Sequence, residues 1–443
     1  MNSTSNLERK LGLFPVVNIV VANVIGAGIF TTTGYLMGYL GNAWLMLILW
    51  VVGGLVAFCG ALSYSELGAN YPEAGGEYTF ISKLFHPLPG FLSGWLSLIV
   101  GFSAPIAASA IGFSKYFIWA FPQIQIINPD VMSKILAITL ILAFTSIHYR
   151  GIVFGTKIQN WLTILKVVLV VGLIVAGFTI GRGSFDHLTG NSLFSGEFKG
   201  WKPIGLSFLF IMFAYTGWNA ATYIGSEIKN PAKTIPRSLL LSTGIVVILY
   251  VLLNLLFVYA IPPDKMINEP EIGGLAAGLA FGKTAEAVIS LLISFALFSS
   301  LSSMIIIGPR VYYSMAKQGY FFQFAANIHP RFGVPSGSVL LQGLLAIIMV
   351  LSGTFEQILI YMGFSLGIFP IIAVLGVVKL RQSGNSVLKM PGYPYVQLIF
   401  MAAGILMLVL SYLERPVESL IAILTVFSGV PFYYWFKRKR RIP

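Results

Sequence analysis

Long apolar runs separated by short polar stretches dominate the chain. A helix that crosses a bilayer needs about 20 consecutive, mostly apolar residues. The sequence predicts twelve such helices, at residues 12–40, 43–70, 78–113, 131–148, 155–180, 202–228, 237–260, 284–316, 337–353, 356–379, 395–413 and 417–436. This pattern predicts an all-α polytopic membrane protein with one domain, residues 1–443, embedded in the membrane. The even number of spans places both termini on one side.

Composition supports a membrane protein. Of 443 residues, 57% are hydrophobic and 10% are charged, and the mean hydropathy is +0.85. A soluble domain carries about 25% charged residues. There is no phosphate-binding GxxxxGK[ST] motif, and we find no nucleophile–base pair inside the predicted spans. We therefore expect neither ATP-driven pumping by this chain nor an enzyme.

The basic residues predict the orientation. With both termini in the cytoplasm, the inside segments hold 19 of the 28 lysines and arginines, the outside segments hold 7, and Lys115 and Lys166 fall within spans. Inside segments of membrane proteins are enriched in such residues. The net charge of +13 is then a consequence of topology, and we expect no nucleic-acid partner. The lipid bilayer is the expected surrounding.

The first predicted span contains an interruption at Gly26, Ala27 and Gly28. Each glycine costs a helix about 1 kcal/mol relative to alanine, and freed backbone groups are tolerated in a membrane where they are buried in protein or line a cavity. Free N–H groups from Ala27 to Phe30 would bind an anion, and the carbonyls near Val24 would bind a cation. An α-amino acid carries both charges. The alternative is a packing motif of small residues.

A second interruption lies in the sixth span, at Tyr215, Thr216 and Gly217. Each interruption follows fifteen residues after the start of its span, counted from Leu11 and Lys202. Paired interruptions in two units of opposite direction predict an inverted-repeat transporter, with the substrate bound near the membrane midplane. The predicted repeats cover residues 12–180 and 202–379, and residues 395–436 form peripheral helices.

Lys166 is a charged residue deep in the fifth span. It lies eleven residues past Gly155, roughly 16 Å along the helix at 1.5 Å per residue. A charge at that depth is expensive and usually functional. No acidic residue lies at comparable depth, so the expected partners are backbone carbonyls at a helix break, hydroxyls, or none for a neutral amine. Lys166 is then a proton carrier, a fixed ammonium in place of a sodium ion, or a lysine tolerated at an aqueous cavity.

Other candidate chemistry is sparse. The single cysteine, Cys59, excludes an internal disulfide, and no His, Cys, Asp or Glu cluster has metal-site spacing. We expect no metal and no cofactor. Glu66 and Glu227 lie at cytoplasmic ends of spans, where they are predicted to pair with lysine or arginine.

Three motifs resemble the APC superfamily, and within it the L-type amino acid transporter (LAT) family: GAGIF at 26–30, YPEAGGEY at 71–78, and FAYTGWN at 213–219 leading to EIKNP at 227–231. The resemblance covers nearly the whole chain. It implies a LeuT-type fold with broken helices 1 and 6 and repeats formed by helices 1–5 and 6–10.

The resemblance also implies residue roles. Backbone N–H groups of Ala27, Gly28 and Ile29, beside Gly26, bind the substrate carboxylate. The amino group is bound by the carbonyls of Val24, Ile25, Phe213 and Thr216. Phe213 is an aromatic gate, Asn219 lines the site and touches helix 1 or the substrate, and Lys166 stands where sodium-coupled relatives bind the ion. Further candidates for the pocket are Tyr215, Met304 and Ser365.

The expected function is sodium-independent transport of small neutral L-amino acids by alternating access, in exchange mode. A neutral substrate is expected because we find no acidic side chain for the pocket and, apart from Lys166, no basic one. Proton symport with Lys166 as the carrier and a non-transporting amino acid sensor are the alternatives. The outside loop at 120–134 lacks the cysteine of heteromeric members, so we expect no disulfide-linked heavy chain. The short polar N-terminus is typical of a bacterial inner-membrane protein.

Overall fold

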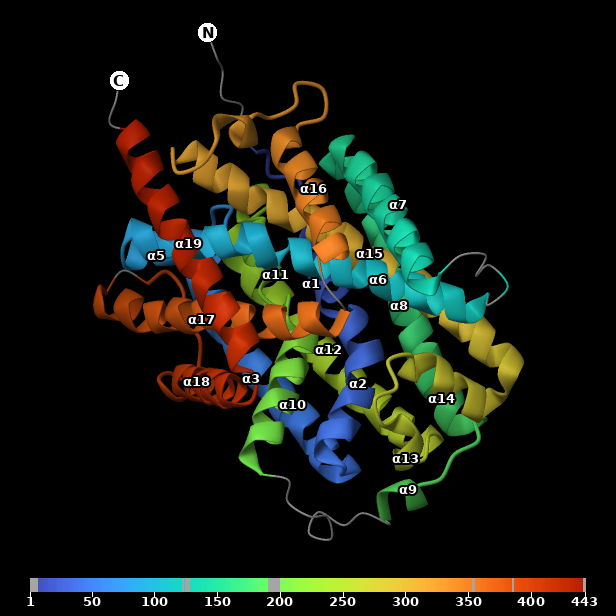
Figure 1. Cartoon of the computed structure of the whole chain (residues 1–443). Coiled ribbons are helices and arrows are strands. Elements are labelled where there is room, and N and C mark those ends of the chain that lie inside the picture. The colour runs from blue at the N-terminus through green and yellow to red at the C-terminus, as the bar shows by residue number, and fades with distance from the viewer. Residues whose placement is uncertain are drawn as a thin grey trace.

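The computed structural model describes residues 7–121, 123, 128–189, 200–352, 355–384 and 386–440, and this part of the chain is almost entirely helical (Figure 1). The first half contains α1 (Leu13–Val24), α2 (Ala27–Leu40), α3 (Ala43–Asn70), α4 (Glu77–Leu84), α5 (Pro87–Leu96), the π-helix η1 (Ser97–Gly101), α6 (Ser103–Ala120), α7 (Pro129–Tyr149), α8 (Ile152–Thr179) and α9 (Asp186–Thr189).

The second half begins with the short segments of the second broken helix. It contains α10 (Trp201–Tyr215), α11 (Ala220–Tyr223), the 3₁₀ helix η3 (Gly225–Glu227), α12 (Pro231–Ala260), α13 (Pro263–Met266), α14 (Ile272–Phe281), α15 (Lys283–Lys317), the 3₁₀ helix η4 (Gln323–Ala326), α16 (Ser336–Ser352), α17 (Phe355–Gln382), α18 (Tyr395–Glu414) and α19 (Pro416–Arg440).

Ten helical stretches of the described chain are long and apolar enough to cross a membrane, which makes this a multi-pass membrane protein. They overlap ten of the twelve predicted spans. The remaining two predictions correspond to α10, of 15 residues, and α16, of 17 residues. Both helices are apolar but shorter than a full span, so the count of twelve stays a prediction.

The third predicted span, 78–113, is wrong as a single helix. The chain forms α4, turns, and begins again with α5 at Pro87, where the His86 side chain accepts a hydrogen bond from the Leu88 N–H at 3.1 Å. Proline fits the first turn of a helix and ends the preceding one. The helix then passes through η1 and continues as α6 to Ala120.

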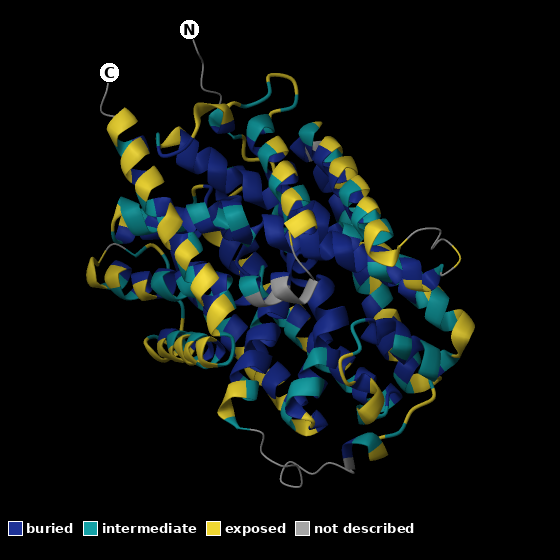
Figure 2. Cartoon of the chain, in the orientation of Figure 1, coloured by how far each residue is buried: buried dark blue, intermediate teal, exposed yellow. Residues whose placement is uncertain are grey.

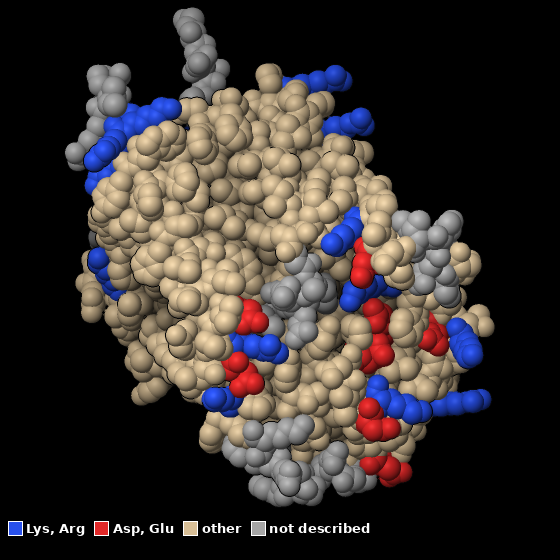
Figure 3. All heavy atoms as spheres, viewed as in Figure 1, with Lys and Arg blue, Asp and Glu red and all other residues tan. Residues whose placement is uncertain are grey.

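Large apolar side chains are exposed on the outer faces of the peripheral helices. Figure 2 shows exposed residues along α7, α16, α18 and α19 around a buried interior, and these residues include Leu142, Leu340, Ile405 and Phe427. Figure 3 shows a surface that is mostly free of charge: the upper end of the view carries lysines and arginines, and the lower half carries basic and acidic residues together. Exposed apolar surface of this extent is typical of contact with lipid.

The two broken helices pack against each other in a reciprocal way. The segment before the first break, α1, contacts α11, the segment after the second break. Conversely, α2 contacts α10. Around this pair, α1 also packs against α8, α12 and α15, and α10 packs against α3, α17 and α18. Both breaks therefore lie in the middle of the bundle.

Candidate functional site

The first break has the predicted position. Helix α1 ends at Val24, Ile25 is non-helical with ψ 83°, Gly26 is extended, and α2 begins at Ala27 without a side-chain cap. The first N–H groups of α2 therefore have no partner within the helix. Gly28 is required for space: a Cβ added there would lie 2.8 Å from the Ala214 Cα atom. The glycine thus allows α2 to approach the end of α10 closely.

The second break also has the predicted position. Helix α10 ends at Tyr215, and Gly217 has φ 99°, a conformation that glycine adopts without strain. A Cβ at Gly217 would lie 2.4 Å from Nδ2 of Asn23. The two breaks are therefore in direct contact, with Asn23 of α1 against the unwound segment of the other helix.

A small cavity lies between the breaks and adjoins a larger one. The small cavity is lined by predicted site residues from both broken helices: Val24, Gly26, Ala27, Gly28, Phe213, Thr216 and the pocket candidate Met304. The larger cavity shares Asn23, Phe213, Thr216 and Met304 with it and adds Asn219, Ser365 and Glu77. The fold thus brings together most of the residues singled out in the sequence.

Four predicted residues line neither cavity. The Tyr215 hydroxyl donates a hydrogen bond to the Trp50 carbonyl at 3.1 Å, so this side chain points toward α3. The side chains of Ile25 and Ile29 are fully buried, and their predicted roles concern backbone groups. Lys166 contacts the first break through the Ala22 and Ile25 carbonyls but does not line either cavity.

Three of the four carbonyls predicted to bind an amino group, those of Val24, Ile25 and Phe213, already accept internal hydrogen bonds. The Val24 carbonyl accepts from the Tyr250 hydroxyl at 2.6 Å and from the Gly26 N–H at 2.7 Å. The Phe213 carbonyl accepts from the N–H and the hydroxyl of Thr216, at 2.9 and 2.6 Å. A carbonyl oxygen has two lone pairs, so a substrate ammonium would share or displace these donors.

Lys166 binds the carbonyl end of α1. Its side chain is fully buried, and Nζ donates to the carbonyls of Ala22 at 3.2 Å and Ile25 at 2.5 Å and to the Ser300 hydroxyl at 2.7 Å. The last carbonyls of a helix lack intrahelical partners and carry the negative end of its dipole. The predicted kind of partner, carbonyls at a break and a hydroxyl, is confirmed.

Asn23 is a site residue that the sequence analysis missed. It is 6% exposed, it lines both cavities, and its Oδ1 atom is buried without a hydrogen-bond partner. A buried acceptor without a donor is rare and costly. Its position three residues before Gly26, in an otherwise apolar run, was the available signal.

Glu77 is the second missed residue, and it corrects the expectation that the pocket has no acidic side chain. Glu77 is 4% exposed and lines the larger cavity. Its carboxylate accepts hydrogen bonds from the Tyr64 hydroxyl at 2.7 Å, the Asn219 amide at 2.6 Å and the Tyr223 hydroxyl. Asn219 therefore lines the cavity as predicted, but its side-chain amide binds Glu77 rather than helix 1.

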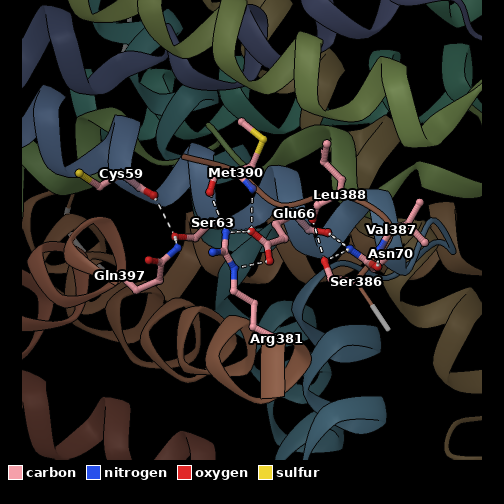
Figure 4. A network of polar contacts seen from close by, with 10 residues as sticks. All are labelled: Cys59, Ser63, Glu66, Asn70, Arg381, Ser386, Val387, Leu388, Met390 and Gln397. Atoms are coloured by element: carbon pink, nitrogen blue, oxygen red, sulfur yellow. Dashed lines mark hydrogen bonds and ion pairs between the residues drawn. The ribbon is translucent and has the colours of Figure 1, made fainter. Parts of the chain in front are cut away.

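Glu227 and Glu66 each pair with an arginine, as predicted. Arg310 of α15 donates to both Glu227 oxygens at 2.9 and 3.1 Å, and both side chains are 2% exposed. Arg381 of α17 binds Glu66 of α3 at 2.8 and 2.6 Å, and the Met390 N–H also donates to Glu66 (Figure 4). These pairs join elements that are far apart in the sequence, so their role is to hold those elements together.

Metal-ligating side chains do not gather in the described chain: no group of three His, Cys, Asp or Glu residues could hold an ion there. The buried His148 at the end of α7 lies 2.8 Å from the Ser302 hydroxyl. Cys59 is a free thiol on α3.

Fold and site together define a polytopic membrane protein with two broken helices in contact. A family model described as amino acid permease matches residues 11–433. The chain therefore belongs to the amino acid permease family, and the predicted membership of the APC superfamily with LAT-type relatives is confirmed.

Curated relatives cover nearly the whole chain. It is 28% identical to the cystine/glutamate transporter of Homo sapiens over 97% of this chain and 85% of that protein. It is 26% identical to the b(0,+)-type amino acid transporter 1 of Mus musculus, over 98% of this chain and 89% of that protein. It is 27% identical to the serine/threonine exchanger SteT of Bacillus subtilis (strain 168), over 98% of each chain. These relatives are transporters, which supports the prediction that this protein is not an enzyme.

Proposed function

We propose that this protein is a sodium-independent exchanger of small neutral L-amino acids that works by alternating access. The observation that carries the proposal is the buried Lys166 ammonium bound to the carbonyl end of α1 and to Ser300. A fixed cation in this position replaces a bound sodium ion, because it neutralises the carbonyl groups at the end of α1 that such an ion would bind. The name of one relative, the serine/threonine exchanger SteT, supports exchange and small substrates.

The substrate would lie between the two breaks. The N–H groups of Ala27, Gly28 and Ile29 face the carboxylate, where the positive end of the α2 dipole adds to the attraction. The ammonium group would take the free Oδ1 of Asn23 together with the carbonyl of Thr216. Phe213 lines both cavities and serves as the gate between them.

A neutral substrate fits the charges of the site. Glu77 is the acidic group of the larger cavity, and its two oxygens already accept three hydrogen bonds. Its charge is therefore compensated by donors of the protein and does not call for a cationic side chain. Lys166 is likewise compensated by its three acceptors.

The reciprocal packing of α1 with α11 and of α2 with α10 supports a LeuT-type inverted repeat. In this proposal residues 12–180 and 202–379 are the repeats, twelve helices span the membrane, and both termini are cytoplasmic in a bacterial inner membrane. No disulfide-linked heavy chain is required, since Cys59 lies within α3.

Uptake of radiolabelled alanine into sodium-free proteoliposomes tests the proposal. We expect uptake only when the lumen contains neutral amino acids, and an inward proton gradient should not drive uptake into empty vesicles. Lys166→Ala should abolish exchange, whereas Lys157→Ala, at an exposed position of the same helix, should leave it intact.

Two results would contradict the proposal. If empty vesicles fill under a proton gradient and Lys166→Ala loses that response, Lys166 is a proton carrier and the protein is a symporter. If alanine binds but no condition gives flux, the protein is a sensor.

A further inference from the structure

Glu77 is held in a cluster that joins three elements. The Tyr64 hydroxyl comes from α3, and Glu77 is the first residue of α4. Asn219 directly precedes α11, and Tyr223 is the last residue of α11. Asn219 also donates to the Tyr223 hydroxyl at 3.1 Å. The cluster therefore connects the half of the second broken helix that follows its break to the two elements beside it.

A glycine turn directly before Glu77 places its carboxylate in this cluster. Gly75 and Gly76 have φ 119° and 54°, conformations that favour glycine. A Cβ at Gly76 would lie 2.5 Å from the Tyr223 ring, and the Gly75 N–H donates to the Tyr223 carbonyl at 3.1 Å. The turn thus places α4 directly against α11, ahead of the span Pro87–Ala120.

The donors around Glu77 are all neutral. Within the described residues, the charged groups of neighbouring elements have other contacts: Arg310 pairs with Glu227, Lys83 with Glu73, Arg381 with Glu66, Lys317 lies over the Tyr313 ring, and Lys379 lies over the Phe85 ring. Burial raises the pKa of the Glu77 carboxyl, against the hydrogen bonds from Tyr223, Tyr64 and Asn219, which lower it. Without a fixed cation, a buried carboxylate is the kind of group that binds a proton reversibly.

The two buried ionisable groups near the breaks therefore differ. Lys166 is surrounded by acceptors that suit an ammonium, and it lines neither cavity. Glu77 is surrounded by neutral donors and lines the larger cavity, which also contains Phe213 and Thr216. Of the two, Glu77 is the one that a proton from the cavity can reach.

We propose that Glu77 is a proton-binding site of the transport cycle: as a carboxylate it holds α11 against α3 and α4, and its protonation releases α11. Hydrogen bonds to an ionised carboxylate are roughly twice as strong as neutral ones, so the protonated acid holds Asn219 and Tyr223 more weakly. Alternating access requires the broken helix to move relative to its neighbours. This inference rests on the transport function proposed above.

The test is the rate of alanine exchange in proteoliposomes with equal pH on both sides, from about pH 5 to pH 8. We expect the wild type to accelerate roughly tenfold toward acid, which corresponds to about 1.4 kcal/mol. Glu77→Gln, a neutral side chain of the same shape, should exchange at a rate that does not depend on pH. Glu73→Gln is the matched control: it removes the same charge from the same loop at an exposed position and should keep the acid response.

A second variant and a second measurement test protonation of Glu77 independently of the Glu77→Gln variant. Tyr223→Phe removes one donor that stabilises the carboxylate, so the acid response should shift to higher pH. Infrared titration should show a protonated-carboxyl band in the wild type and in Glu73→Gln that Glu77→Gln lacks.

The proposal is overturned if wild-type exchange does not depend on pH, or if Glu77→Gln keeps the acid response. If the wild type does not exchange at all, the proposed function fails with it. The infrared titration then still separates the two failures, because an absent band shows that Glu77 binds no proton, whereas a present band leaves only the transport role refuted.

Discussion

At the scale of single residues, the site depends on which backbone and side-chain acceptors are still free. Val24 and Phe213 offer carbonyls that internal donors already occupy, whereas Asn23 offers an oxygen with no donor. A substrate ammonium would therefore gain most from Asn23, since it relieves an unsatisfied group and forms a charge-assisted hydrogen bond at the same time.

Asn23→Ala should weaken amino acid binding roughly 10- to 100-fold, because a hydrogen bond to a charged group contributes about 1.5–3 kcal/mol. Protein stability should change little, since Oδ1 has no internal partner to lose. Isothermal titration with alanine and thermal unfolding would measure both effects. Asn18→Ala, on the same helix as Asn23, is the control. It removes a 3.2 Å hydrogen bond from the Asn18 amide to Asn160 of α8 and should leave affinity unchanged. Equal affinity losses in the two variants would argue against a direct role for Asn23.

At the scale of elements, the close contact of α2 with α10 sets the geometry of the proposed site. Gly28 leaves space for the backbone at Ala214 and for the Phe213 ring, whose Cε1 atom would lie 3.2 Å from an added Cβ. The free N–H groups of α2 and the gate residue are therefore held at fixed positions relative to each other.

Gly28→Val should abolish amino acid binding, because the added side chain forces α2 away from Ala214 and blocks access to the start of the half-helix. Such overpacking costs about 1–3 kcal/mol of stability. The measurement is alanine-induced thermal stabilisation of purified protein. Gly172→Val on α8, where an added Cβ meets nothing within 4 Å, is the matched control. Retained affinity of Gly28→Val for any amino acid would refute the site between the broken helices.

The buried ion pair between η3 and α15 is also an element-scale feature. Arg310→Ala should destabilise the protein by about 3–5 kcal/mol, since it leaves Glu227 buried and unpaired. Lys83→Ala removes one partner of the exposed pair with Glu73 and should cost at most about 1 kcal/mol. Unfolding free energies in detergent would compare them. Similar losses in both variants would show that the buried pair contributes no more than the exposed one.

At the scale of the whole molecule, an apolar belt surrounds a core in which polar side chains and both breaks are buried. The described chain begins, ahead of α1, and ends, with α19, at the same end of the bundle (Figure 1). This arrangement agrees with an even number of spans, and the excess of lysine and arginine in the segments on that side predicts that it faces the cytoplasm.

Protease-cleavable tags on each terminus would test this orientation. In intact cells neither tag should be cut by external protease, and both should be cut after the membrane is permeabilised. A tag in the outside connection at 181–202 serves as the positive control. Cleavage of either terminal tag in intact cells would overturn the predicted topology.

The sequence by itself determined the class of protein and the position of both breaks. Long apolar runs can form only spanning helices in lipid, where every backbone group needs an internal partner. Glycine marks the points where that ladder ends, at Gly26 and Gly217. The family motifs and the arginine pairing of Glu66 and Glu227 could also be predicted, because charge in a membrane protein requires a partner.

Only the tertiary structure decided which side chains meet at the breaks. Glu77 and Asn219 are 142 residues apart, and no local pattern indicates that a glycine turn brings them together. The direction of Tyr215 toward Trp50, the free oxygen of Asn23 and the internal donors on Val24 and Phe213 likewise depend on packing between distant helices. The period of apolar residues fixes which segments are helical, but the partner of each buried polar group follows from the three-dimensional packing of the bundle.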